Sequence, residues 1–181
     1  MKFVALLILS SLLFFPACSN EEPVAPEEGI PFLNEKLNFD NAFVSRVRSL
    51  PDGNFQTMVT LLASPASRSF SEGITGLPAD AFEFTINSGS SPLDLPDGNY
   101  IYGNLQAPFQ FTSSYLKNDL TITFSDTYEV RSGSIAVSTT DDGTKLLSFD
   151  LETVSSADFF NPDASIVKMK GESEVNLVAL E

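Results

Sequence analysis

Alternation of apolar and polar residues with a period of two constrains this chain more than any other feature. The clearest alternating stretches cover residues 55–61, 82–87, 120–125, 135–137, 147–152 and 174–179. Successive side chains of a strand point to opposite faces of a sheet, so each stretch predicts a strand with one buried face. No long segment shows the three-to-four-residue spacing of an amphipathic helix. The sequence therefore predicts an all-β fold.

Turn-forming residues separate the predicted strands. Pro51-Asp52-Gly53-Asn54 recurs as Pro96-Asp97-Gly98-Asn99, and each copy lies between a leucine and an aromatic residue. Asp141-Asp142-Gly143 and Lys170-Gly171-Glu172 have the composition of hairpin tips, and residues 64–76 and 155–164 are predicted to be long loops. Short strands joined by such turns favour an antiparallel β-sandwich, with a β-barrel as the alternative.

The first residues have a different character and predict export. Lys2 precedes an apolar stretch over residues 3–15. This stretch is shorter than the roughly 20 residues that span a bilayer, and it has the length of a signal-peptide hydrophobic region. Phe15-Pro16-Ala17-Cys18 resembles the lipobox of bacterial lipoprotein precursors, and Cys18 is the only cysteine of the chain. The resemblance implies cleavage after Ala17 and lipid, such as palmitate, on Cys18; an ordinary secretory signal is the alternative.

Proline and glutamate dominate the residues after the predicted cleavage site. Such a composition predicts an extended, disordered tether over residues 18–36. We therefore divide the chain into a signal peptide (1–17), an acylated tether (18–36) and a single domain (37–181). Ser19-Asn20-Glu21-Glu22 resembles the acidic export tag of surface lipoproteins of the Bacteroidota. It implies anchoring at the outer membrane, with the cell surface as the expected side and the periplasmic side as the alternative.

Composition excludes several classes of function. The chain has 24 acidic and 10 basic residues and a formal net charge of −14, which disfavours binding to nucleic acid. It has no histidine, so the usual Ser-His-Asp, Cys-His and zinc sites lack their general base or ligand. We predict that the protein is not an enzyme, and a carboxylate-dependent glycosidase is the least favoured alternative.

Two groups of residues are candidates for binding, and no catalytic residue is predicted. Tyr100, Tyr102 and Tyr115 are candidate ligand-binding residues because exposed aromatic rings stack on sugars; the alternative is that they complete the core. Asp141 and Asp142 are candidate calcium ligands because calcium prefers carboxylate oxygens; the alternative is a solvated turn. No other cofactor or metal is predicted.

The body of the chain carries a second resemblance. Residues 93–102, which contain Leu95-Pro96-Asp97-Gly98-Asn99-Tyr100, resemble the Leu-Pro-x-Gly-x-Tyr start of a strand in small uncharacterised lipoproteins of the Bacteroidota. Residues 133–137 and 147–151 resemble a later hairpin of those proteins. The resemblance implies structure and no activity. We expect a membrane-anchored, non-enzymatic domain that binds a glycan, peptide or protein partner. The alternative is an accessory subunit of a pilus or a nutrient-uptake complex, joined by strand addition.

Overall fold

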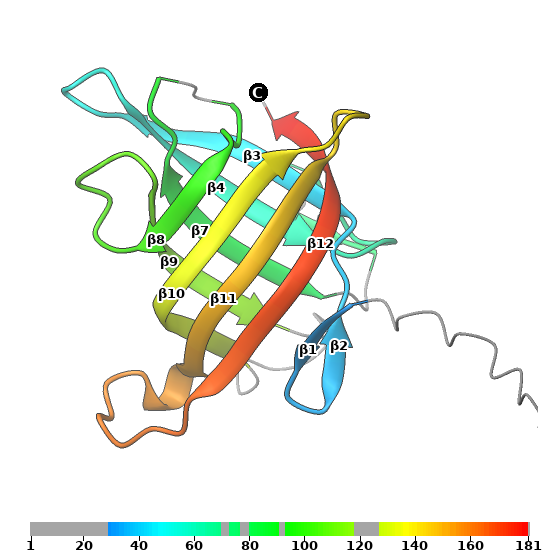
Figure 1. Ribbon diagram of the computed structural model, residues 1–181, viewed down its shortest axis with the longest axis vertical. Coiled ribbons are helices and arrows are strands. Elements are labelled where there is room, and N and C mark those ends of the chain that lie inside the picture. Colours follow the sequence, from blue (N-terminus) through cyan, green and yellow to red (C-terminus); the bar gives the residue numbers. More distant parts are fainter. Residues whose placement is uncertain (1–28, 70–72, 77–79, 91–92, 118–126, 181) are drawn as a thin grey trace, which may run out of the picture.

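Eight strands form a closed barrel in the computed structural model (Figure 1). The structure describes residues 29–69, 73–76, 80–90, 93–117 and 127–180. Its elements are β1 (Ile30–Phe32), β2 (Glu35–Leu37), β3 (Asn41–Ser49), β4 (Phe55–Leu62), β5 (Ser67–Ser69), β6 (Gly73–Thr75), β7 (Ala81–Asn87), β8 (Gly98–Tyr102), β9 (Gln110–Lys117), β10 (Thr127–Thr139), β11 (Lys145–Ser155), the short 3₁₀ helix η2 (Ser156–Asp158) and β12 (Val167–Leu180). The all-β prediction is confirmed, and the architecture is the barrel that the sequence offered as the alternative to a sandwich.

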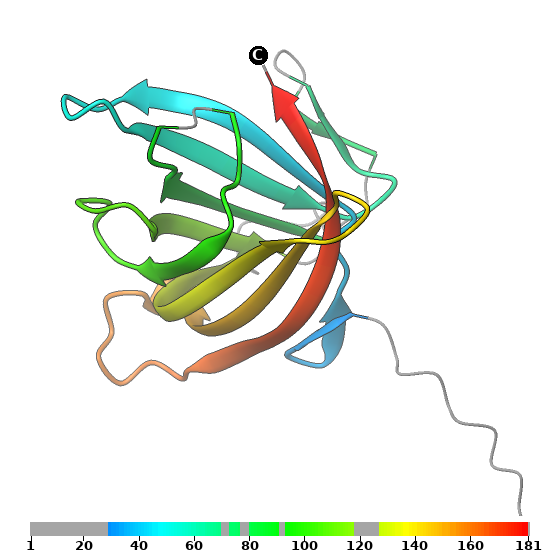
Figure 2. The same cartoon turned by 45° about the horizontal axis from the view of Figure 1, so that its top comes forward.

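The barrel order is β10-β11-β12-β3-β4-β7-β9-β8, and β8 pairs with β10 to close the sheet (Figures 1 and 2). Two of the pairings, β12 with β3 and β8 with β9, are parallel, and the other pairings around the barrel are antiparallel. A sandwich would leave two sheets with free edges, whereas here the first and last barrel strands meet. The described part of the chain contains no helix with the length and apolarity needed to cross a membrane.

Apolar side chains fill the inside of the barrel. Eight-stranded barrels are just wide enough for side chains to fill their interior. The alternating residues of the sequence supply them, as predicted for residues 82–86 and 147–151. The main buried cluster includes Ala42, Val44, Val59, Leu61, Phe82, Phe84, Ile86, Leu95, Phe111, Val130, Ile135, Val137, Leu147, Phe149, Leu151, Met169 and Val175.

The predicted tether contains a hairpin that belongs to this core. Strands β1 and β2 pair, and Ile30, Phe32 and Leu37 are at most 1% exposed. The ring of Phe32 meets that of Tyr128 edge to face, with centroids 5.1 Å apart. The folded unit therefore begins before the predicted boundary at residue 37. Because prolines and charged residues dominate this segment, its composition does not reveal the short alternation of buried Ile30, exposed Pro31 and buried Phe32. The predicted signal peptide, Cys18 and the strand over residues 120–125 lie outside the described residues.

The interpretation of residues 170–172 is wrong. Lys170-Gly171-Glu172 is not a hairpin tip, because it lies within β12 and Gly171 pairs with Phe149 of β11. A side chain at Gly171 would press against Ile30, whose Cγ2 atom lies 3.2 Å from the ideal Cβ position. This glycine therefore marks the close approach of the β1–β2 hairpin to β12.

The predicted loop over residues 64–76 contains a hairpin, β5–β6, on the outside of the barrel. Arg68 fixes it there. The guanidinium group donates to Thr60 Oγ1 and lies 2.8 Å from Glu83 Oε2. A second apolar cluster outside the barrel includes Phe43, Leu62, Ala63, Ala66 and Ala81.

Candidate binding surface

Tyr100 and Tyr102 do not form an exposed aromatic platform. Tyr100 is 1% exposed, and its hydroxyl donates to the backbone oxygen of Pro96 at 2.8 Å. Burial raises the pKa of Tyr100 above its usual range. Tyr102 is half-buried against the ring of Phe111, with centroids 5.5 Å apart. Both rings therefore complete the core, which was the alternative interpretation. The side chain of Tyr115 lies outside the part of the chain that the structure describes.

Of the acidic pair at the β10–β11 turn, Asp142 stabilises the turn itself. The carboxylate of Asp142 accepts from Thr140 Oγ1 at 2.5 Å, from Thr144 Oγ1 at 2.9 Å and from Thr144 N at 3.2 Å. These hydrogen bonds, that of the Thr140 hydroxyl first, hold the pKa of Asp142 below its ordinary value. Asp141 is exposed beside it. In the described ranges, no three Asp, Glu, Cys or His side chains are grouped so that they could hold a metal ion.

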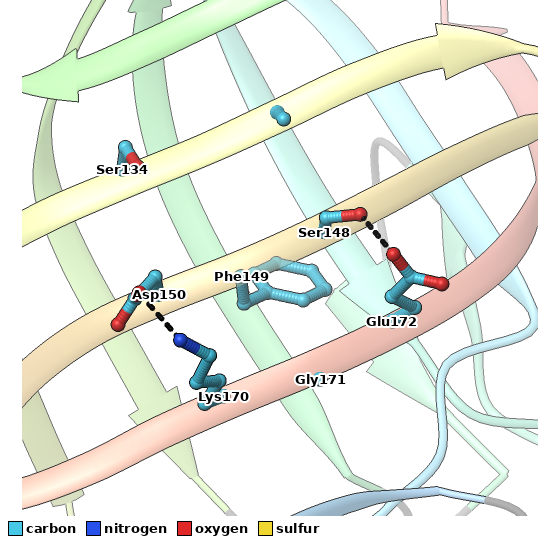
Figure 3. A pocket seen from close by; sticks show the side chains of 8 residues that line it. Ser134, Ser148, Phe149, Asp150, Lys170, Gly171 and Glu172 are labelled. Carbon is cyan, nitrogen blue, oxygen red and sulfur yellow. Dashed lines mark hydrogen bonds and ion pairs between the residues drawn. The ribbon is translucent and has the colours of Figure 1, made fainter.

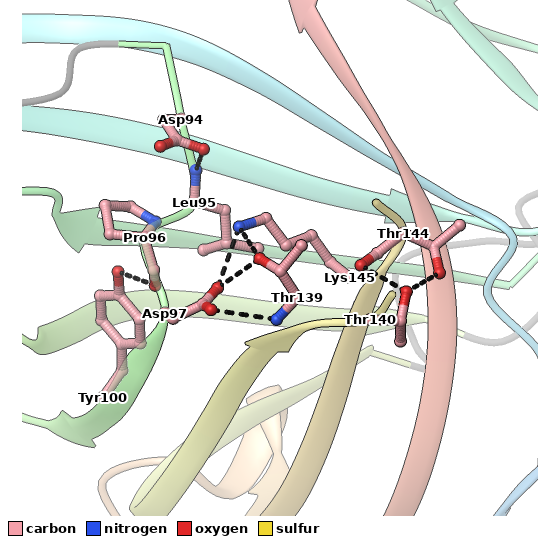
Figure 4. Close-up of polar contacts among 9 residues, drawn as sticks. All are labelled: Asp94, Leu95, Pro96, Asp97, Tyr100, Thr139, Thr140, Thr144 and Lys145. Atoms are coloured by element: carbon pink, nitrogen blue, oxygen red, sulfur yellow. Dashed lines mark hydrogen bonds and ion pairs between the residues drawn. The ribbon is translucent and has the colours of Figure 1, made fainter. Parts of the chain in front are cut away.

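The two Pro-Asp-Gly-Asn copies have different roles. Asp52 caps its own turn by accepting from the backbone and side-chain nitrogens of Asn54. Asp97 instead binds the neighbouring strand, since Gly98 next to it pairs with Val137 of β10 (Figure 4). It accepts from Thr139 N at 3.1 Å, from Thr139 Oγ1 at 2.7 Å and from Lys145 Nζ at 3.0 Å.

This Asp97 cluster ties the start of β8 to the β10–β11 hairpin. The Lys145 side chain is only 10% exposed, so its ammonium group needs the nearby carboxylate. The Thr139 hydroxyl, and after it Lys145, hold the pKa of Asp97 below its ordinary value. Since these groups satisfy one another, we assign the cluster a structural role.

An open depression lies on the outer face of β10, β11 and β12 (Figure 3). We call it the outer groove. β10 forms its floor, because the outward positions of this strand in the groove carry only the small side chains of Ser134 and Ala136. The longer side chains of β11 and β12 rise beside them. The lining residues are Ser134, Ala136, Ser148, Phe149, Asp150, Lys170, Gly171 and Glu172.

Positively and negatively charged groups face the outer groove, together with hydroxyl groups. Lys170 Nζ lies 3.0 Å from Asp150 Oδ2, and Ser148 Oγ donates to Glu172 Oε1 at 2.7 Å (Figure 3). The Lys170 and Asp150 side chains are 74% and 65% exposed. An ion pair this exposed contributes about 0–1 kcal/mol, so a ligand can take over its partners at little cost. The groove thus offers an ammonium donor, carboxylate acceptors and hydroxyl groups on a rigid sheet.

The sequence analysis did not identify this surface, although a signal for it was present. Residues 132–138 place Ser132, Ser134, Ala136 and Ser138 at alternate positions, which puts four small side chains on one face of a strand. That face is visible from the period-two pattern. Which charged strands lie beside it depends on the order of strands in the barrel, and local sequence does not give that order.

Comparison with known proteins gives no relative: no protein-family model matches the chain, and neither a curated protein nor a solved structure matches it.

Proposed function

We propose that this chain is a lipoprotein of the outer membrane, anchored through lipid on Cys18, whose barrel binds a glycan in the outer groove without chemically changing it. The cell surface is the proposed side, and the periplasmic side is the alternative. The observation that carries the proposal is the set of polar groups in the groove. Sugars present hydroxyl groups that both donate and accept hydrogen bonds, which matches serine hydroxyls beside a carboxylate and an ammonium group.

Backbone pairing in the groove favours recognition by side chains. Ser134 of β10 is paired with Ile101 of β8 on one side and with Asp150 of β11 on the other. The strand at the floor of the groove therefore has a neighbour on both sides, and a peptide cannot extend the sheet there. This supports a glycan over an extended peptide. It also counts against an assembly subunit joined by strand addition, since that mechanism needs a free sheet edge.

The proposed anchor rests on the lipobox resemblance of residues 15–18. One acyl chain gives marginal, reversible membrane binding, whereas two or more hold a protein firmly. The lipobox resemblance implies several acyl chains on Cys18. A Cys18→Ala variant should accordingly move from the membrane fraction to the soluble fraction of the cell, and mass spectrometry of the purified chain should detect the lipid on the wild type alone.

A glycan array followed by calorimetric titration tests the binding role. Ser134→Phe places a bulky ring on the floor of the groove, and we expect it to weaken binding of a glycan hit at least tenfold. Ser90→Phe is the matched control, because Ser90 is an exposed residue that does not line the groove. If both variants bind like the wild type, the groove is not the site. If the glycan is shortened during the titration, the glycosidase alternative replaces the binding role.

A further inference from the structure

One end of the barrel carries exposed apolar side chains. The β1–β2 hairpin and the loop between η2 and β12 lie at the same end in both views, and the β3–β4 hairpin lies at the other (Figures 1 and 2). We call the first the hairpin end. Its two segments expose Leu33 (48%), Phe160 (94%) and Ile166 (45%).

The loop holds Phe160 in this position. Arg131 donates to the backbone oxygens of Asp158, Phe159 and Asn161, and its guanidinium carbon lies 5.9 Å from the centroid of the Phe159 ring. The Phe159 ring in turn meets that of Phe160 edge to face, with centroids 5.3 Å apart. The Arg131 bonds brace the loop backbone on both sides of Phe160, so its ring stays in water. Burying such a ring elsewhere would recover about 1.5–3 kcal/mol.

Leu33 is exposed for a separate reason. It lies in the turn between β1 and β2 and has a φ of 55°, in the left-handed region. A side chain costs roughly 1–2 kcal/mol in this conformation, and glycine avoids that cost. The turn nevertheless keeps a leucine and exposes it. Two segments far apart in the sequence thus present apolar groups at the same end of the barrel.

The position of the tether identifies what covers this end. Gly29, the first described residue, leads directly into β1. Ten residues lie between Cys18 and Gly29, and the eleven Cα–Cα steps from one to the other reach at most ~40 Å when fully extended. The tether therefore joins the barrel at the hairpin end, which is nearer to Cys18 along the chain than the β3–β4 end.

We propose that the hairpin end docks on the membrane surface, with Phe160 and Leu33 inserted among the lipid headgroups. This docking rests on the anchor of the proposed function. Asp158 of η2 and Asp163 of the loop add negative charge at this end, and the chain has a net charge of −14. An anionic surface repels these charges, so the lipid partner is a zwitterionic phospholipid. The docked barrel is held in a fixed orientation with its β3–β4 hairpin away from the bilayer.

The absence of tryptophan from the sequence provides a direct test. The variant Phe160→Trp carries a single indole at the hairpin end. Val47→Trp is the matched control, because Val47 is 52% exposed near the end of β3, at the β3–β4 end. Each full-length lipidated chain is reconstituted into phosphatidylcholine vesicles with or without brominated acyl chains. We expect the emission of Phe160→Trp to shift to the blue and to be quenched by bromine, and that of Val47→Trp to do neither.

The outcomes separate docking from anchoring. If the chain is lipidated and bound to vesicles but the indole at position 160 is not quenched, docking is refuted and the anchor stands. A blue shift without quenching means that protein covers Phe160, which also refutes docking. If no lipid is attached to Cys18, both fail. Replacing half of the phosphatidylcholine by phosphatidylglycerol should weaken the quenching; unchanged quenching would contradict the choice of a zwitterionic surface.

Discussion

Phe32→Ala tests whether the N-terminal hairpin is part of the folded domain. Phe32 is 1% exposed, contacts Tyr128 and lies in a segment whose composition predicts a disordered tether. Truncating a buried phenylalanine to alanine costs about 3–5 kcal/mol, and a domain of this size loses about 2–4 °C in melting temperature per kcal/mol. We therefore expect a loss of about 6–20 °C.

Urea denaturation followed by circular dichroism measures the underlying loss in free energy of unfolding. It should appear as a lower urea midpoint with an unchanged slope. Pro31→Ala is the control within the same strand. Pro31 is exposed, so its replacement should change the free energy of unfolding by no more than about 1 kcal/mol. If Phe32→Ala is as stable as the wild type within about 0.5 kcal/mol, the hairpin does not belong to the core, and the tether extends to Lys36 as the composition suggests.

Three further changes test other parts of the barrel. Gly133→Ala should destabilise the protein severely, because a Cβ atom there would overlap the backbone oxygen of Asp150. Gly143→Ala should cost only the roughly 1–2 kcal/mol of a side chain in the left-handed region, since nothing lies within 4 Å of the ideal Cβ position. If the two variants lose the same free energy of unfolding in urea denaturation, this reasoning is contradicted. Asp97→Asn should be less stable than the wild type at pH 7. This difference in the free energy of unfolding should narrow as the pH falls from the unfolded-state pKa of about 4 toward the lower folded-state pKa, because protonation of Asp97 removes the stabilising charge. A gap in urea midpoints that stays constant from pH 7 to pH 3 would show that the charge of Asp97 contributes nothing. Arg68→Ala should release the β5–β6 hairpin to proteases and leave the barrel intact, and an unchanged digestion pattern would mean that the guanidinium group does not hold it.

Local patterns predicted where the strands lie in the sequence, but not which strands pair with one another. The alternation at residues 82–86 and 147–151 gave both the strands and their buried faces, because burial of one face is a local property of a strand. Closure of the barrel depends on which strand meets which, and the parallel pairing of β12 with β3 has no signature in either segment. Gly171 shows the same limit. A glycine fits this position because Ile30, which is far away in the sequence, lies close to it.

The candidate site divides in the same way. Aromatic residues and acidic turns are the usual signals for binding, and here they mark the core and a capped turn. Tyr100 is in the core because it alternates with the outward-facing Asn99 and Ile101 of β8, and the apolar Ile101 hides this alternation in the sequence. The outer groove arises from three strands laid side by side, and only the small side chains on its floor are readable from one of them.

Closure of the barrel also determines when the chain can fold. The hydrogen bond from Asn176 to the backbone oxygen of Asp40 spans 136 residues, so the last strand has to arrive before the sheet can close. Contacts this distant in sequence slow folding, because a long loop must be ordered before any of them forms. A chain whose last strand has not yet been made therefore stays open. A product cut short before β12 would leave the edge of β3 unpaired, which makes it a substrate for proteases and for aggregation.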